Sequence, residues 1–153
     1  MKKWIVAARL RTLPLAFSCI GMGAFLAAFD NSFVPFIFGL CLLTTLFLQV
    51  LSNLANDYGD AIHGADSEAR KGPSRAVQSG QISKSQMKKA MGLFVVLSLV
   101  SGILLLYIAQ LPPSVLCVFL VLGVLAVCAS ILYTNGKIPY GYIGLGDFFV
   151  FVF

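Results

Sequence analysis

The longest uncharged stretch of the chain is residues 90–136, which read AMGLFVVLSLVSGILLLYIAQLPPSVLCVFLVLGVLAVCASILYTNG. About 20 apolar residues in a helix are enough to cross the hydrocarbon core of a bilayer, so this stretch is too long for a single crossing. The tandem prolines Pro112 and Pro113 divide it, because proline has no N–H to donate inside a helix. The stretch therefore predicts two membrane-spanning helices, over residues 90–110 and 114–134.

Two shorter uncharged stretches come before it, over residues 12–29 and 31–56. With a rise of about 1.5 Å per residue, each is long enough to span a membrane as a helix. A fifth span is expected over residues 148–153, where the chain cuts it off. The strands of a membrane barrel would alternate apolar and polar residues, and these stretches do not alternate. We therefore predict an all-α fold for the single membrane domain 1–153, a polytopic transmembrane helical bundle with four complete spans and the start of a fifth.

The composition excludes other classes of protein. Of 153 residues, 59% are hydrophobic and 11% are charged, and the mean hydropathy is +0.92. Soluble domains carry about 25% charged residues, so an ordinary soluble domain and a disordered chain are both excluded. The net charge is +5, but no basic stripe with interleaved aromatic residues lies outside the apolar stretches, so nucleic acid is not an expected partner. The four cysteines lie within apolar stretches and are expected to be small hydrophobic side chains of helices.

The positions of Lys and Arg predict how the chain is oriented in the membrane. Four of these residues precede the first span, six lie in the loop 57–89 and one lies in the loop 135–147. The turns 30–33 and 111–113 contain none. Because basic loops stay on the cytoplasmic side, we expect a cytoplasmic N-terminus in a cell's inner (cytoplasmic) membrane, with both long loops beside it.

An acidic cluster lies at the end of the second span. Asn53, Asn56, Asp57 and Asp60 are three and four residues apart, so they share one helical face if the helix continues about one turn past residue 56. Two carboxylates on that face would repel each other unless a cation lay between them. Mg²⁺ takes oxygen ligands and typically uses one or two carboxylates together with substrate phosphates. The spacing therefore favours a divalent cation here, although a solvated loop of mixed charge is an alternative that the residues leave open.

A basic pair follows the acidic cluster. Lys71 and Arg75 are four residues apart, with Gly72 and Pro73 between them. Two cations on such a turn suit phosphate, which arginine can bind through two parallel hydrogen bonds. Carboxylates that hold a metal, followed by bases that hold phosphate, indicate a diphosphate site.

Two further residues each allow two interpretations. Tyr58 is either an aromatic residue at the membrane interface or part of a cavity wall that stabilises a cation. Asp147 precedes the fifth span, where it is either stabilised by the helix dipole or faces a cavity at the same end of the bundle as the acidic cluster. Asp30 is expected to be a turn residue, and His63 is expected to be a loop residue that faces water.

These residues make the chain resemble the UbiA superfamily of intramembrane aromatic prenyltransferases, over nearly its whole length. The resemblance is carried by Asn56-Asp-Tyr-Gly-Asp60, Gly72-Pro-Ser-Arg-Ala-Val-Gln-Ser-Gly80, Tyr133-Thr and Gly144-Leu-Gly-Asp147. The segments Arg-Ala-Val-Gln-Ser-Gly and Gly-Leu-Gly-Asp favour the subgroup that prenylates 1,4-dihydroxy-2-naphthoate in menaquinone synthesis. In the superfamily motif N-D-x-x-D-x-x-x-D the last acid falls on Gly64 of this chain, with Asp66 two residues later, and Ala76 replaces a frequent proline.

The resemblance implies a Mg²⁺-dependent reaction in the lipid bilayer, with the active site facing the cytoplasm. A polyprenyl group would pass from polyprenyl diphosphate to 1,4-dihydroxy-2-naphthoate with loss of CO₂, giving a demethylmenaquinone. It also implies roles for individual residues. The metal would be bound by Asn56, Asp57, Asp60 and Asp66, of which Asp57 and Asp60 would be catalytic. The diphosphate would be bound by Lys71 and Arg75. The aromatic substrate would be contacted by Asp147 and Tyr58, and a second ion is the alternative partner of Asp147.

The superfamily has about nine transmembrane helices and a second acidic motif, so the resemblance implies that this chain is the N-terminal half. Three alternatives to an active enzyme remain open: half of a transporter, a subunit that assembles with a partner, or an inactive fragment. A transporter typically places ionisable residues within its spans, along the pathway. In this chain the acids gather at the edge of a span, which favours the enzyme.

Overall fold

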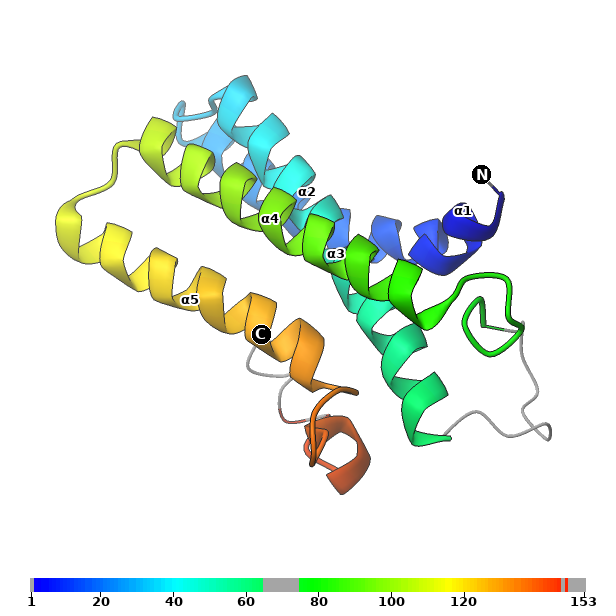
Figure 1. Ribbon diagram of the computed structural model, residues 1–153. Coiled ribbons are helices and arrows are strands. Elements are labelled where there is room, and N and C mark those ends of the chain that lie inside the picture. The colour runs from blue at the N-terminus through cyan, green and yellow to red at the C-terminus, as the bar shows by residue number, and fades with distance from the viewer. Residues whose placement is uncertain (1, 65–74, 147, 149–153) are drawn as a thin grey trace.

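The computed structural model describes residues 2–64, 75–146 and 148, and these residues form helices and connecting loops without any strand (Figure 1). Four of the helical segments are long and apolar enough to cross a membrane. The predicted all-α transmembrane bundle is therefore confirmed, while its orientation stays a prediction. The fifth predicted span lies almost entirely outside the described residues. In chain order the elements are α1 (Lys2–Ala8), η1 (Leu10–Thr12), α2 (Leu13–Phe29), α3 (Pro35–His63), α4 (Lys84–Ala109), α5 (Pro113–Leu132) and η2 (Tyr140–Ile143).

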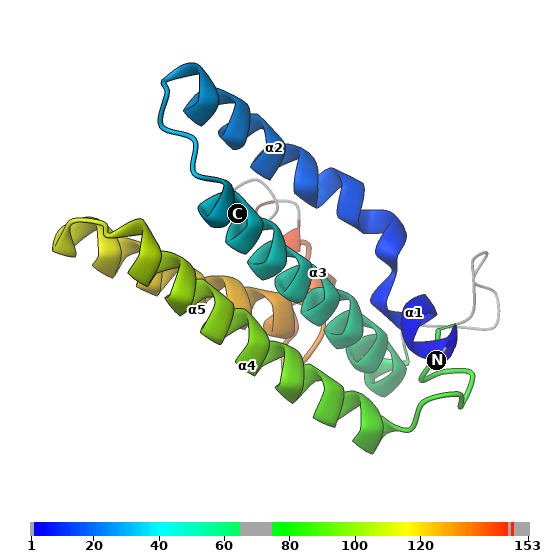
Figure 2. The same ribbon diagram turned by 90° about the horizontal axis from the view of Figure 1, so that it is seen from above.

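Helix α3 is the centre of the arrangement. It contacts α1, α2, α4 and α5, and its contacts with α4 are the most extensive. Figures 1 and 2 show α2, α3 and α4 side by side. Helix α5 comes nearest to α3 at the C-terminal end of α5. Within the apolar region, the Thr44 hydroxyl of α3 donates to the Ser101 hydroxyl of α4 at 3.0 Å. Such a bond between helices contributes about 0.6 kcal/mol in a membrane, so apolar packing holds most of the pair together.

Both α3 and α4 extend beyond the uncharged stretches into polar sequence. Helix α3 continues through the acidic cluster to His63 and is capped by Gly64, whose left-handed φ of 65° is a conformation that glycine adopts easily at a helix end. Helix α4 begins within the charged loop, where Ser83 and Gln86 form a reciprocal capping box. The acidic cluster therefore lies on a rigid helix rather than in a loop.

The N-terminal segment, which precedes the first predicted span, is also folded. Residues 2–8 form α1, and Arg9 then takes a left-handed conformation with φ of 48°, which is uncommon for a residue other than glycine. This turn redirects the chain into η1 and α2. Helix α1 packs on α3 with Ala7 buried, so the N-terminus is fixed at the same end of the bundle as the acidic cluster (Figure 2).

The best-packed part of the described chain is also at this end, which we call the polar end. Its core comprises Leu51, Leu54 and Ala55 of α3, Ala76, Val77 and Ile82 of the following loop, and Met87 of α4. By contrast, α2, α4 and α5 expose many large apolar side chains along their lengths, as helices that face an apolar environment do. The polar residues of the cluster thus lie beside the most extensively buried part of the described chain.

Candidate functional site

Three segments meet on the C-terminal half of α3, and each is fastened there by a polar residue of the predicted cluster. The first segment is the N-terminal one. Asn53 donates from Nδ2 to the carbonyl oxygen of Ala8 at 2.9 Å and lies 3.2 Å from the Thr12 hydroxyl. Asn53 is 4% exposed, so this amide fixes the connection between α1 and α2 against α3.

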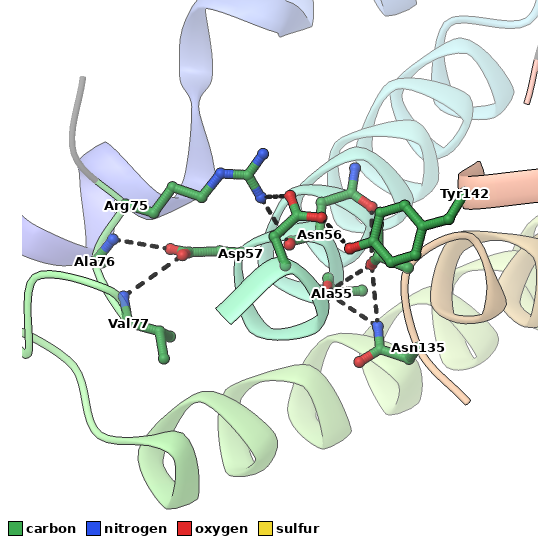
Figure 3. Close-up of polar contacts among 10 residues, drawn as sticks. Ala55, Asn56, Asp57, Arg75, Ala76, Val77, Asn135 and Tyr142 are labelled. Atoms are coloured by element: carbon green, nitrogen blue, oxygen red, sulfur yellow. Dashed lines mark hydrogen bonds and ion pairs between the residues drawn. The ribbon is translucent and has the colours of Figure 1, made fainter. Parts of the chain in front are cut away.

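Asp57 fastens the second segment, the loop that follows the undescribed residues 65–74. Its Oδ2 accepts from the backbone N–H of Ala76 at 3.1 Å, and its Oδ1 accepts from that of Val77 at 3.4 Å (Figure 3). The carboxylate is 2% exposed. A carboxylate has about four lone-pair sites, so these two bonds leave further acceptor capacity on both oxygens. Asp57 positions the start of the loop that carries Arg75.

Arg75 turns back from this loop toward α3 and joins Asp60. Its Nη1 forms an ion pair with Asp60 Oδ2 and donates to the carbonyl oxygen of Asn56 at 2.8 Å (Figure 3). The two side chains of the pair are only 11% and 9% exposed. Burial, followed by the positive charge of Arg9, lowers the pKa of Arg75, while Asp57 and Tyr142 raise it. The guanidinium stays charged, because arginine is not deprotonated in proteins.

The third segment runs from the end of α5 through η2. The Thr134 hydroxyl lies 3.0 Å from the carbonyl oxygen of Ala55 and 3.2 Å from Asn56 Oδ1, and Asn135 Nδ2 donates to the same Ala55 oxygen at 2.9 Å. Farther along, the Tyr142 hydroxyl donates to Asp60 Oδ1 (Figure 3). Asn56 and Asp60 are thus each in contact with the residues that follow α5.

The close approach of α5 to α3 depends on Gly59. A Cβ atom at this position would lie 2.4 Å from the carbonyl oxygen of Thr134 and 2.6 Å from its Cβ. Real Cβ atoms essentially never come this close to other heavy atoms. Only glycine leaves room for Thr134 here.

The structure brings together four of the predicted site residues, Asn56, Asp57, Asp60 and Arg75. Tyr58 lies in the core, 9% exposed, with the Lys88 ammonium 5.5 Å from the centre of its ring, which is a cation–π geometry. His63 is exposed, as predicted, but it is the last residue of α3 rather than a loop residue, and its ring packs edge-to-face with that of Tyr142 at 5.7 Å. The predicted Asp66, Lys71 and Asp147 lie outside the described residues.

The described donor set suits a cation that is shared with a substrate. Within residues 2–64, 75–146 and 148, no group of three or more His, Cys, Asp or Glu side chains could hold a metal ion by itself. Asp57 and Asp60 nevertheless offer two carboxylates three residues apart on one helix, and the Asn56 amide is beside them. Asp57 is bonded to the loop backbone and Asp60 to Arg75 and Tyr142, so a cation here would use their remaining lone pairs. The residue types are those that Mg²⁺ uses, because it commonly takes one or two carboxylates and completes its shell with substrate phosphates and water.

Sequence reasoning did not identify Thr134, Tyr142 or Gly59 as parts of this site. Gly59 and Thr134 belong to segments that carry the resemblance, but their spacing gives neither a role at the site. Tyr142 is 82 residues from Asp60, and no spacing rule connects a loop tyrosine to a helix that far away. The one available signal was a glycine, Gly59, between two acids on one helix, because a residue without a side chain lets another segment approach closely.

The sequence of the chain is similar to a known protein family and to several known proteins. Residues 15–153 match the UbiA prenyltransferase family. The chain is 47% identical over 98% of its length to 1,4-dihydroxy-2-naphthoate octaprenyltransferase of Escherichia coli and 48% identical over its whole length to that of Haemophilus influenzae. The enzyme of the same name from Mycobacterium tuberculosis is 34% identical over 99% of the chain.

The chain spans about half the length of these relatives, 49%, 50% and 49% respectively. No solved structure matches it. The family match covers well over half of the chain and includes the acidic cluster and Arg75. The chain belongs to the UbiA prenyltransferase family.

Proposed function

We propose that this chain carries the diphosphate-binding part of an enzyme that transfers a polyprenyl group to 1,4-dihydroxy-2-naphthoate in menaquinone synthesis. The observation that carries the proposal is the buried guanidinium of Arg75, held between Asp60 and the Asn56 carbonyl at the polar end of the helices. A cation and carboxylates gathered beside apolar helices suit a substrate with a charged diphosphate head and a hydrocarbon tail. The names of the relatives support the choice of acceptor.

In the proposed reaction, the bond between the allylic carbon and the diphosphate oxygen breaks, and its electron pair leaves with the diphosphate. The allylic cation then forms a bond with a carbon of the electron-rich naphthoate ring. The carboxyl group departs as CO₂ and leaves its bonding electrons in the ring, which yields the reduced form of a demethylmenaquinone. No outside oxidant or reductant is needed for this balance.

The described residues would act mainly by holding positive charge next to the leaving diphosphate. Arg75 would contact the leaving diphosphate, where negative charge grows as the bond breaks, and a pre-positioned cation stabilises that charge without first reorganising. Bound Mg²⁺ would neutralise the same oxygens as a Lewis acid. Asn56, Asp57 and Asp60 would hold this ion, with Asp66 as a further ligand and Lys71 as a second base for the diphosphate. Tyr58 and Asp147 remain weaker candidates for contact with the aromatic substrate.

The substitution Arg75→Lys tests the diphosphate assignment. Lysine keeps the positive charge but lacks the planar fork that lets one arginine contact the Asn56 carbonyl and a phosphate together. Loss of one charged hydrogen bond is worth about 1.5 kcal/mol, so we expect the KM for polyprenyl diphosphate to rise about tenfold. The measurement is steady-state transfer of a polyprenyl group to 1,4-dihydroxy-2-naphthoate by the full natural protein in detergent.

Lys89→Arg is the matched control, because it exchanges the same two residue types at an exposed position of α4. It should leave both kinetic constants unchanged. An Arg75→Lys enzyme with the wild-type KM for polyprenyl diphosphate would remove Arg75 from the substrate site. A wild-type protein that transfers no prenyl group to the naphthoate would overturn the proposed function itself.

A further inference from the structure

Tyr142 reaches the acidic cluster from a part of the chain that the proposed reaction does not use. Its hydroxyl donates to Asp60 Oδ1, while Arg75 occupies Oδ2 of the same carboxylate (Figure 3). Each oxygen of Asp60 therefore has a donor of its own. Asp60 is 6% exposed and Tyr142 is 43% exposed, so the hydroxyl of an exposed tyrosine bonds a buried carboxylate.

The turn that carries Tyr142 is braced at several points. The backbone N–H of Gly141 donates to the carbonyl oxygen of Tyr133 at 2.9 Å, and a Cβ on Gly141 would lie 2.7 Å from that oxygen. The Tyr140 hydroxyl donates to the Ala129 carbonyl at 2.7 Å, and its ring packs edge-on against that of Tyr133 at 5.3 Å. These contacts fix η2 to the end of α5, so the phenol has a set position.

The Tyr142 ring is also restrained from the side of α3. It packs edge-to-face with the His63 ring at a centroid distance of 5.7 Å and an interplanar angle of 79°. His63 and Asp60 are three residues apart and therefore neighbours on the helix surface. The ring and the hydroxyl of Tyr142 thus dock together on one short stretch of α3.

A phenol and a guanidinium act differently on a carboxylate. A tyrosine hydroxyl donates a hydrogen bond without carrying a positive charge, so it orients Asp60 without cancelling its charge. Carboxylates that bind metals are commonly oriented by such hydrogen bonds, and loss of the orienting partner typically costs 10–100-fold in metal affinity. We propose that Tyr142 is a positioning residue that orients the Asp60 carboxylate for a divalent cation, and this role rests on the proposed function.

The experiment measures the binding of Mn²⁺ alone, as a paramagnetic substitute for Mg²⁺, to the full natural protein in detergent by electron paramagnetic resonance. Tyr142→Phe keeps the ring and removes the donor, and we expect the Kd for Mn²⁺ to rise at least about tenfold. The midpoint of thermal unfolding should change little, because the contact with the His63 ring remains.

Tyr140→Phe is the matched control. It removes one hydroxyl from the same turn, but that hydroxyl contacts the Ala129 carbonyl rather than the acidic cluster. We expect it to lower the midpoint of thermal unfolding while the Kd for Mn²⁺ stays within about twofold, well short of the tenfold effect expected at Tyr142. An equal rise in Kd for both variants would show that Tyr142 only supports the turn, and an unchanged Kd in Tyr142→Phe would overturn its role directly.

Asp60→Asn separates this inference from the proposed function. If Asp60→Asn loses Mn²⁺ binding and Tyr142→Phe does not, the metal assignment stands and the positioning role of Tyr142 falls. If Asp60→Asn binds Mn²⁺ as the wild type does, the metal site of the proposed function is wrong, and the role of Tyr142 falls with it. Loss of binding in both, with Tyr140→Phe unaffected, is the expected result.

Discussion

Asp60→Asn should lower the kcat/KM of prenyl transfer by about 10³-fold while the protein still inserts into the membrane. Asparagine has nearly the same shape and can still accept from the Tyr142 hydroxyl, but it carries no charge. The substitution removes one of two carboxylates proposed to hold the cation, and loss of a single group that stabilises charge in a transition state costs about 10²–10³-fold. The measurement is the transfer rate across a Mg²⁺ titration, and added Mg²⁺ should not restore the rate of the variant.

Two controls make this result specific. Asp30→Asn removes a carboxylate from the exposed end of α2, at the opposite end of the bundle, and should leave the rate unchanged. Asp60→Asn also leaves Arg75 buried without its partner carboxylate, which costs about 3–5 kcal/mol when a buried pair is broken. The double variant Asp60→Asn/Arg75→Gln should recover stability but not activity. Near-wild-type transfer by the single variant would exclude Asp60 from the site.

The helices could be predicted from the sequence because lipid leaves the chain little choice. Backbone groups inside a membrane must bond within their own segment, so an uncharged stretch of sufficient length is a helix. This reasoning does not apply to polar sequence outside the membrane, so it does not predict where the helices end there. Helix α3 continues to His63 and α4 begins at Lys84, in both cases through polar residues whose conformation is fixed by caps and by packing.

The candidate site was predictable in composition but not in contacts. Helical spacing placed Asp57 and Asp60 on one face, and both do lie at the site. Their partners differ, because Asp57 bonds the backbone of the loop and Asp60 bonds Arg75 and Tyr142. These partners are 15 to 82 residues away, and which carboxylate meets which segment depends on how the loops dock. Residue spacing along one helix does not predict which distant segment each carboxylate will contact.

Gly59→Ala is expected to have the second largest effect, because it acts on that docking. In the interior of a helix, alanine is favoured over glycine by about 1 kcal/mol, so an open position would be stabilised. At Gly59 the new Cβ meets the backbone oxygen of Thr134, and Thr134 is 2% exposed, so it can move only by disturbing the residues packed around it. Overpacking of this kind costs up to about 3 kcal/mol, so the net loss in the free energy of unfolding should be about 2 kcal/mol.

The effect of Gly59→Ala on transfer should exceed what the loss of stability alone would cause. If Thr134 is pushed away, its contact with Asn56 is lost, and η2 moves with it and withdraws Tyr142 from Asp60. Gly39→Ala makes the same substitution on the same helix, at a position where the new Cβ meets no described atom within 4 Å. We therefore expect Gly39→Ala to unfold at an equal or higher temperature with full activity, and Gly59→Ala to unfold earlier and to lose nearly all transfer. Equal behaviour of the two variants would mean that the contact between Gly59 and Thr134 does not hold the site together, because both share the gain in helix propensity and only one has the clash.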